Sequence, residues 1–299
     1  MKTDGAVVAL QYPYELEGGV LSAHAADDTG FATANCAVVL ERDAALLIDT
    51  GFTVHRELLL DDLCDTVGED RTLSILPLRM GEMNSICNVR SIVSSRPVQV
   101  LYGNMGDPAS LVDFLPQDVP FGTPPRHGVM ADLDVEVVRP GSDIAVGASG
   151  ERVLRVLTAP LQLLPFSWVY DPGSGTLFTS DVFAYRRREF ASGPWVVSNV
   201  SDMAPDDDVY RQLTHSRYWW LAGADTRAIV ADLTELFSTL DVRTIFPAFG
   251  CVLRGADVVN AHVEQLFRVL GRASRDESVG VAAGRWRNRP VRTPGENHV

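Results

Sequence analysis

The feature that most constrains the fold is the stretch 73–89, in which an apolar run ends in a polar turn and a second apolar segment follows. The run 73–78 has the length of a buried strand, and residues 84–94 have the apolar spacing of a helix. Between them Gly81 marks a tight turn, with Glu82 and Asn84 beside it. We therefore predict that this strand–loop–helix junction forms the functional site.

Elsewhere the sequence predicts strands that alternate with helices, which indicates a layered α/β fold. In the first half we expect strands at 1–11, 18–24, 33–40, 44–48 and 98–102, and helices at 54–63 and from about 108, with an irregular loop at 117–127. In the second half we expect an antiparallel meander at 135–138, 143–146 and 153–158, a hairpin at 168–179, helices at 209–221, 228–240 and 255–270, and a strand at 244–246. This order fits two stacked sheets flanked by helices, an αββα sandwich.

Composition narrows the range of partners. The formal net charge of −13 argues against a nucleic-acid backbone or an anionic membrane as the main partner. The chain shows no signal peptide and no apolar segment long enough to span a bilayer, so we expect a cytoplasmic protein. The cysteines form no Cys-x-x-Cys pair, and we expect all four to be buried, reduced thiols. The six histidines are scattered, without a His-x-His pair.

The domain boundary is predicted near the C-terminus. Residues 1–272 contain all the expected strands and helices, so we assign them to one domain. From about residue 273 the chain becomes polar, arginine-rich and proline-containing. We expect 273–299 to be a flexible tail or a strap that binds a partner.

Five segments carry a resemblance to a known family. The segments are 30–40, the Leu-Ile-Asp-Thr-Gly run 47–51, 159–167, 175–183 and 245–254. In this order and at these intervals, the chain from about 19 to 270 resembles the metallo-β-lactamase-like domain of flavodiiron and oxygen-binding di-iron proteins. The resemblance implies the αββα fold, a head-to-tail homodimer and a structural role for Asp49 in orienting the loop that follows its strand. Since no stretch for a flavodoxin domain follows residue 270, we do not expect the family's electron transfer from flavin to metal.

The family's metal ligands are the part of the motif that this chain does not keep. Two carboxylates remain, Glu82 and Asp181, the latter where the family has its bridging aspartate. The other ligand positions, four of them histidines in the family, are occupied here by Met80, Asn84, Ser85, Leu163 and Phe249. Iron or zinc needs several nitrogen or anionic donors, so the resemblance implies a repacked pocket. We expect no metal and no other cofactor.

The two remaining carboxylates have two possible roles. If Glu82 and Asp181 face each other among apolar neighbours, they would share a proton and act as a general acid and base. Alternatively, Glu82 pairs with Arg79 or another arginine, and Asp181 caps a turn through backbone N–H groups. Asn84 and Ser85 are predicted to cap the helix that begins there.

Three functions follow from these expectations. The first is a metal-free protein that binds an apolar or aromatic small molecule, or a partner, in the former metal pocket. The second is a repurposed enzyme whose catalytic residues are Glu82 and Asp181. The third is a residual oxygen- or nitric-oxide-handling metalloprotein whose ligands lie elsewhere in the sequence.

Overall fold

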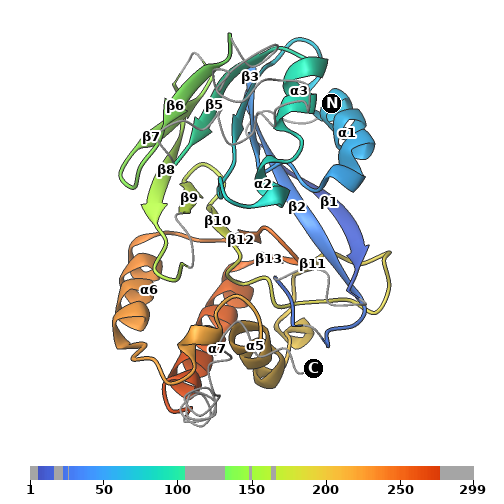
Figure 1. Ribbon diagram of the computed structural model, residues 1–299. Coiled ribbons are helices and arrows are strands. Elements are labelled where there is room, and N and C mark those ends of the chain that lie inside the picture. Colours follow the sequence, from blue (N-terminus) through green and yellow to red (C-terminus); the bar gives the residue numbers. More distant parts are fainter. Residues whose placement is uncertain are drawn as a thin grey trace, which may run out of the picture.

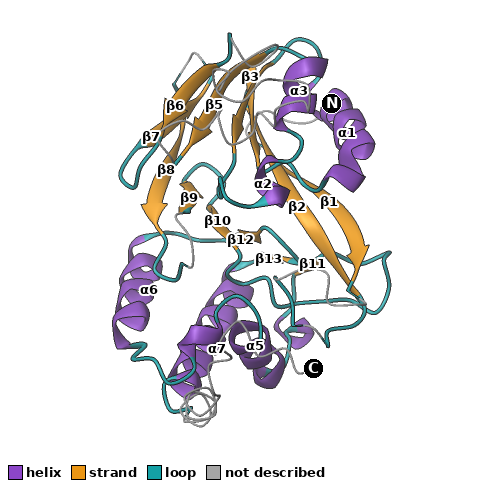
Figure 2. Cartoon of the chain, viewed as in Figure 1, coloured by secondary structure: helices purple, strands orange, loops and turns teal. Residues whose placement is uncertain are grey.

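A computed structural model describes residues 6–16, 23–25, 27–104, 132–147, 150–162 and 166–276. Its strands form two sheets that lie face to face, with helices on the outer side of each (Figures 1 and 2). The predicted αββα sandwich is therefore confirmed.

The first sheet is built by the N-terminal part of the chain. Its strand order is β1-β2-β3-β4-β5-β6. The first three strands pair antiparallel, and β3 to β6 pair parallel. The bounds are β1 Val7–Glu15, β2 Phe31–Leu40, β3 Ala44–Ile48, β4 Thr72–Leu76, β5 Val98–Gly103 and β6 Asp134–Val137; the helices are η1 Thr53–His55, α1 Arg56–Val67, α2 Met83–Ile86 and α3 Val89–Ser95.

The second sheet has the order β11-β13-β12-β10-β9-β8-β7. Strands β7 to β10 pair antiparallel, and β10 pairs parallel with β12. The bounds are β7 Asp143–Val146, β8 Arg152–Thr158, β9 Ser167–Asp171, β10 Thr176–Ser180, β11 Val196–Val197, β12 Thr244–Pro247 and β13 Val252–Arg254; the helices are η3 Val200–Asp202, α5 Asp206–Thr214, η4 Trp219–Leu221, α6 Arg227–Thr239 and α7 Ala256–Ala273.

The core has three main layers of apolar side chains. One lies between the first sheet and α1 and α3, and a second lies between the two sheets. The third lies between the second sheet and α5, α6 and α7. Strands β2 and β3 are buried over nearly their whole length because both of their faces are covered, which explains why they read as continuous apolar runs.

Several sequence predictions of local structure are wrong. In the stretch 18–24, the two described residues, Ala23 and His24, lie in a turn or bend rather than a strand. Strand β6 pairs parallel with β5 in the first sheet and is not part of the meander. The helix expected at 209–221 ends at Thr214, and a separate 3₁₀ turn, η4, follows. Cys64 is exposed and Cys87 is half-buried, whereas Cys36 and Cys251 are buried as expected.

The helix expected at 84–94 is divided in two at Asn88. The side-chain amide of Asn88 donates hydrogen bonds to the carbonyl oxygens of Thr50 (2.8 Å) and Phe52 (3.1 Å). These bonds tie the break between α2 and α3 to the segment that follows β3.

The helix expected from 108, the loop at 117–127 and nearly all of the predicted tail lie outside the described residues. Among the helices of the described part, none is both long enough and apolar enough to cross a bilayer.

Candidate functional site

The loop between β4 and α2 is held in place by the end of β3. Asp49 ends that strand with a φ of 59°, and its Oδ1 accepts a hydrogen bond from the backbone N–H of Leu78 (2.9 Å). The sequence predicts that Asp49 orients the loop that follows its own strand, whereas the structure shows it bound to the loop that follows β4. Burial raises the pKa of this carboxyl group to about 6, against the opposing effect of Arg79.

The loop directs Arg79 into the interior, where its side chain is only 2% exposed. The guanidinium group forms a short ion pair with Oδ1 of Asp181 and donates to Oδ1 of Asn84 (2.8 Å). It also lies over the ring of Phe249, 5.3 Å from the centroid, which is cation–π geometry. The buried positive charge therefore has a carboxylate, an amide oxygen and an aromatic face as partners.

A second guanidinium group comes from Arg217, in the segment between α5 and η4. It binds Glu82 in a bidentate manner, with Nη1 2.6 Å from Oε1 and Nη2 2.9 Å from Oε2. The same Nη1 lies 3.1 Å from Oδ2 of Asp181. Asp181 thus bridges two cations, one on each carboxylate oxygen. We call Arg79, Asp181, Arg217 and Glu82 the ion-pair cluster.

Asp181 reaches this position because β10 ends irregularly. The register between β10 and β12 shifts at the end of β10, and Ser180 has a φ of 56°. The carbonyl oxygen of Ser180 accepts a hydrogen bond from the N–H of Ala248 (2.7 Å), which ties this end to the segment after β12. The ion-pair cluster therefore joins the end of a strand in the second sheet to a loop that leaves the first sheet.

Aromatic side chains surround one side of the cluster. Phe249 packs with the rings of Phe52, Tyr14 and His24. The Tyr14 hydroxyl lies 2.7 Å from Nε2 of His24. Burial lowers the pKa of His24 to about 4, so its imidazole is neutral at pH 7. Nearby, the Tyr218 hydroxyl is buried and has no hydrogen-bond partner among the described residues, and burial raises its pKa well above the usual value.

The structure brings Glu82 and Asp181 together as expected, but Arg217 lies between them. The premise of two carboxylates without a cation is therefore wrong. The alternative, an arginine on Glu82, is confirmed, although the arginine is Arg217 and not Arg79. Asp181 accepts its hydrogen bonds from arginines rather than from a turn. A catalytic role for either carboxylate stays a prediction.

Two of the other predicted site residues, Asn84 and Phe249, both contact Arg79. Met80 belongs to the apolar cluster under α1, whereas Phe249 belongs to the aromatic group described above. Asn84 binds Arg79, and neither Asn84 nor Ser85 caps α2, whose N-terminal residue has no side-chain cap. Leu163 lies outside the described residues.

Sequence reasoning did not name Arg217, and it named Arg79 only as a possible partner of Glu82. The position of Arg79 in the predicted loop was a usable signal. Arg217 gave none, because it lies 135 residues from Glu82 and belongs to no motif.

The residues present do not fit a di-metal centre. Within the described ranges, no three histidine, cysteine, aspartate or glutamate side chains converge in a way that could hold a metal ion. Both oxygens of Asp181 and both oxygens of Glu82 already accept bonds from guanidinium groups. A metal ion would have to displace these cations, and no imidazole is present among the cluster residues to offset the loss.

Comparison of the sequence with profiles of known families and with curated proteins gives no match. Solved structures do match. Rubredoxin oxygen:oxidoreductase from Desulfovibrio gigas has a TM-score of 0.63 at 14% identity, over 92% of this chain and 61% of that one. The flavodiiron protein from Giardia intestinalis has a TM-score of 0.60 at 14% identity, over 88% and 57%.

A shorter structure matches over nearly its whole length. It is fragment 1–254 of a putative diflavin flavoprotein from Nostoc, with a TM-score of 0.62 at 16% identity, over 91% of this chain and 95% of the fragment. The present chain spans about three-fifths of the two longer proteins. The chain therefore has the metallo-β-lactamase-like fold that is found in flavodiiron proteins.

Proposed function

We propose that this chain is a metal-independent binding protein. The observation that carries the proposal is the position of Asp181, whose two carboxylate oxygens each bind a guanidinium group. Arginine side chains here supply the positive charge that metal ions would supply at a bridging carboxylate. The site is thereby structural, and binding takes place at its edge.

The charges of the ion-pair cluster favour this interpretation. Two carboxylates and two guanidinium groups balance each other, and a buried charge needs such a partner to be tolerated. The bidentate contact of Arg217 with Glu82 also fixes the geometry, which a lysine could not do. Two fixed cations would repel an incoming metal ion.

The ligand that we propose is an apolar or aromatic small molecule. Met83 directly follows Glu82 and is 48% exposed, and Trp219 lies two residues after Arg217 and is 61% exposed. Contiguous exposed apolar patches often mark binding surfaces, and we propose that Met83 and Trp219 belong to one such patch. We therefore place the ligand against Met83 and Trp219, next to the Glu82–Arg217 pair.

The acid–base alternative has less support from the geometry. A general base needs a free oxygen within reach of the substrate, and the carboxylate oxygens of both residues are engaged by arginines. If the chain were an enzyme of this kind, Glu82→Gln and Asp181→Asn would abolish turnover. Under our proposal the same substitutions leave ligand binding nearly unchanged in whatever fraction remains folded.

Metal analysis tests the absence of a metal centre. The full chain is purified from cells grown with added iron and zinc, and its metals are measured per folded chain. We expect far less than one iron or zinc ion per chain, and no change in the melting temperature after treatment with a chelator. A stoichiometric transition metal would overturn the proposal.

A fluorescent probe tests the binding surface. We expect the native protein to bind 1-anilinonaphthalene-8-sulfonate, and the variant Met83→Ala/Trp219→Ala to lose most of this binding. Phe190→Ala is a matched control, because Phe190 is 67% exposed but is not a neighbour of the cluster in sequence. Equal binding by all three proteins would contradict the proposed surface.

A further inference from the structure

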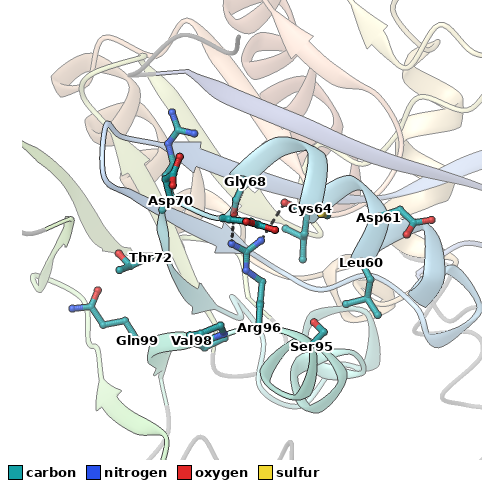
Figure 3. A pocket seen from close by; sticks show the side chains of 14 residues that line it. Leu60, Asp61, Cys64, Gly68, Asp70, Thr72, Ser95, Arg96, Val98 and Gln99 are labelled. Carbon is teal, nitrogen blue, oxygen red and sulfur yellow. Dashed lines mark hydrogen bonds between the residues drawn. The ribbon is translucent and has the colours of Figure 1, made fainter.

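A cavity separate from the ion-pair cluster lies at the C-terminal end of α1. Its volume is about 650 Å³, and it is lined by the second half of α1, the turn that leads to β4, and the residues that join α3 to β5 (Figure 3). None of its lining residues belongs to the ion-pair cluster. Its volume lies within the range of about 300–1,000 Å³ that is usual for small-molecule sites.

The cavity has apolar walls on two sides. Leu60 and Leu63 contribute from α1, and Pro97 and Val98 contribute from the start of β5. Burying apolar ligand surface against such walls is favourable by roughly 25 cal/mol per Å². These walls can therefore hold the body of an aromatic or aliphatic molecule.

The two arginines that line the cavity form hydrogen bonds with backbone carbonyl groups. Arg96 donates to the oxygens of Leu63 (3.2 Å) and Gly68 (2.7 Å), and so binds the C-terminal end of α1 (Figure 3). Arg71 donates to the oxygens of Glu41 (2.7 Å) and Val67 (3.2 Å). Their donors are thus directed at the walls of the cavity.

The carboxylates that line the cavity are available to a ligand. Asp61, Glu69 and Asp70 are exposed, and their side chains make no hydrogen bond or ion pair with any residue in the described part of the chain. They outnumber the two lining arginines. Because the chain as a whole carries a charge of −13, the surrounding field also attracts cations.

We propose that this cavity binds a small organic cation, namely a molecule with an aromatic or aliphatic body and a protonated amine. The body lies between the α1 wall and the β5 wall, and the amine faces the negatively charged rim, to which Asp61 contributes from α1 and Glu69 and Asp70 contribute from the turn after it. This site is independent of the function proposed for the ion-pair cluster.

Cys64 provides a direct measurement, because its thiol lines the cavity and is the exposed one of the four cysteines. We propose to measure its rate of alkylation by iodoacetamide in the full chain by mass spectrometry. The probes are tryptamine, the neutral tryptophol and the anionic indole-3-propionate, each at the same millimolar concentration. We expect tryptamine to slow alkylation at least threefold, tryptophol to slow it less, and indole-3-propionate to have no effect. The half-buried Cys87 is the internal reference, whose rate should not change.

Charge variants separate a local site from a general charge effect. Asp61→Asn/Glu69→Gln/Asp70→Asn should abolish the difference between tryptamine and tryptophol. The control Asp232→Asn/Glu235→Gln/Asp257→Asn removes the same number of exposed carboxylates from α6 and α7 and should retain it. Equal protection by all three probes, no protection by tryptamine, or equal loss in both variants would each overturn the proposal.

Discussion

At the scale of single residues, the bridging contacts of Asp181 decide what this site can do. A buried carboxylate needs charged or hydrogen-bonding partners, and here two guanidinium groups of the chain itself supply them. A guanidinium group is planar and always charged, so it can meet two acceptors in fixed directions. The cation that holds the site together is thereby encoded in the sequence and does not have to be acquired.

The substitution Arg79→Met tests the contribution of the buried guanidinium group. It keeps much of the side-chain volume but leaves Oδ1 of Asp181 and the Asn84 amide without their partner. We expect a loss of about 3–5 kcal/mol in the free energy of unfolding, measured by urea denaturation, because removal of one member of a buried pair leaves the other uncompensated. The exposed control Arg139→Met should change stability by less than about 0.5 kcal/mol.

Asp49 makes stability depend on pH. Its pKa is raised from 3.8 to about 6 in the folded protein, so the native state binds this proton more tightly than the unfolded chain does. The resulting stabilisation is fully present below pH 3.8 and is lost as the pH rises through about 6. Relative to Asp49→Asn, the wild type should lose on the order of 3 kcal/mol between pH 4 and pH 7. Urea denaturation at four pH values measures this difference, and a constant difference would show that Asp49 is not the cause.

At the scale of elements, strand β2 positions the segment that carries Phe249. The Asn35 side chain donates to the carbonyl oxygens of Pro247 and Gly250, both at 2.9 Å, and accepts hydrogen bonds from Thr33 and Gln11. Through these contacts a strand of the first sheet fixes the connection between β12 and β13 in the second. The ring under Arg79 therefore depends on an amide more than two hundred residues earlier in the sequence.

The substitution Asn35→Ala should release this connection. It leaves buried carbonyl oxygens without a donor, and we expect a loss of about 2–4 kcal/mol in unfolding free energy. The substitution should increase the rate of hydrogen exchange more at 248–252 than in strands β7 and β8. Asn260→Ala, the same substitution at an exposed position of α7, is the control and should leave both measurements unchanged.

At the scale of the whole molecule, the two sheets are joined in two ways. Apolar side chains from both sheets form one shared core, and the ion-pair cluster links the loop after β4 to the end of β10. The two sheets cannot separate without exposing the buried charges of the ion-pair cluster. The molecule should therefore unfold as a single unit despite its length.

Two spectroscopic signals test this cooperativity. The tryptophans of the described residues are Trp168, Trp195, Trp219 and Trp220, so their fluorescence reports on the second half of the chain, whereas far-ultraviolet circular dichroism reports on both halves. We expect the two urea transitions to coincide. Separate midpoints would show that the sheets unfold independently.

The homodimer stays a prediction, and an unfolding midpoint that rises with protein concentration would support it.

The sequence by itself determined the fold and most of the strands and helices, although strands β11 and β13 were not predicted. Segment 44–48 is apolar throughout because both faces of its strand are covered, and a local pattern of this kind can be recognised in the sequence. The differences from the family's ligand motifs could also be seen in the sequence, since Met80, Ser85 and Phe249 stand at positions where the resemblance implies histidines. The ends of helices were harder to predict from the sequence. Asn88, for example, divides a helix through hydrogen bonds to Thr50 and Phe52, which lie more than thirty residues away.

Only the tertiary structure decided which side chains are the partners of Glu82 and Asp181. Charge pairing depends on distance in space, and the partners of Glu82 and Asp181 come from positions 79 and 217. No periodicity or motif connects these positions. The folded sheets bring these side chains within hydrogen-bonding distance. At that distance the carboxylates are no longer free, because they form ion pairs with the guanidinium groups.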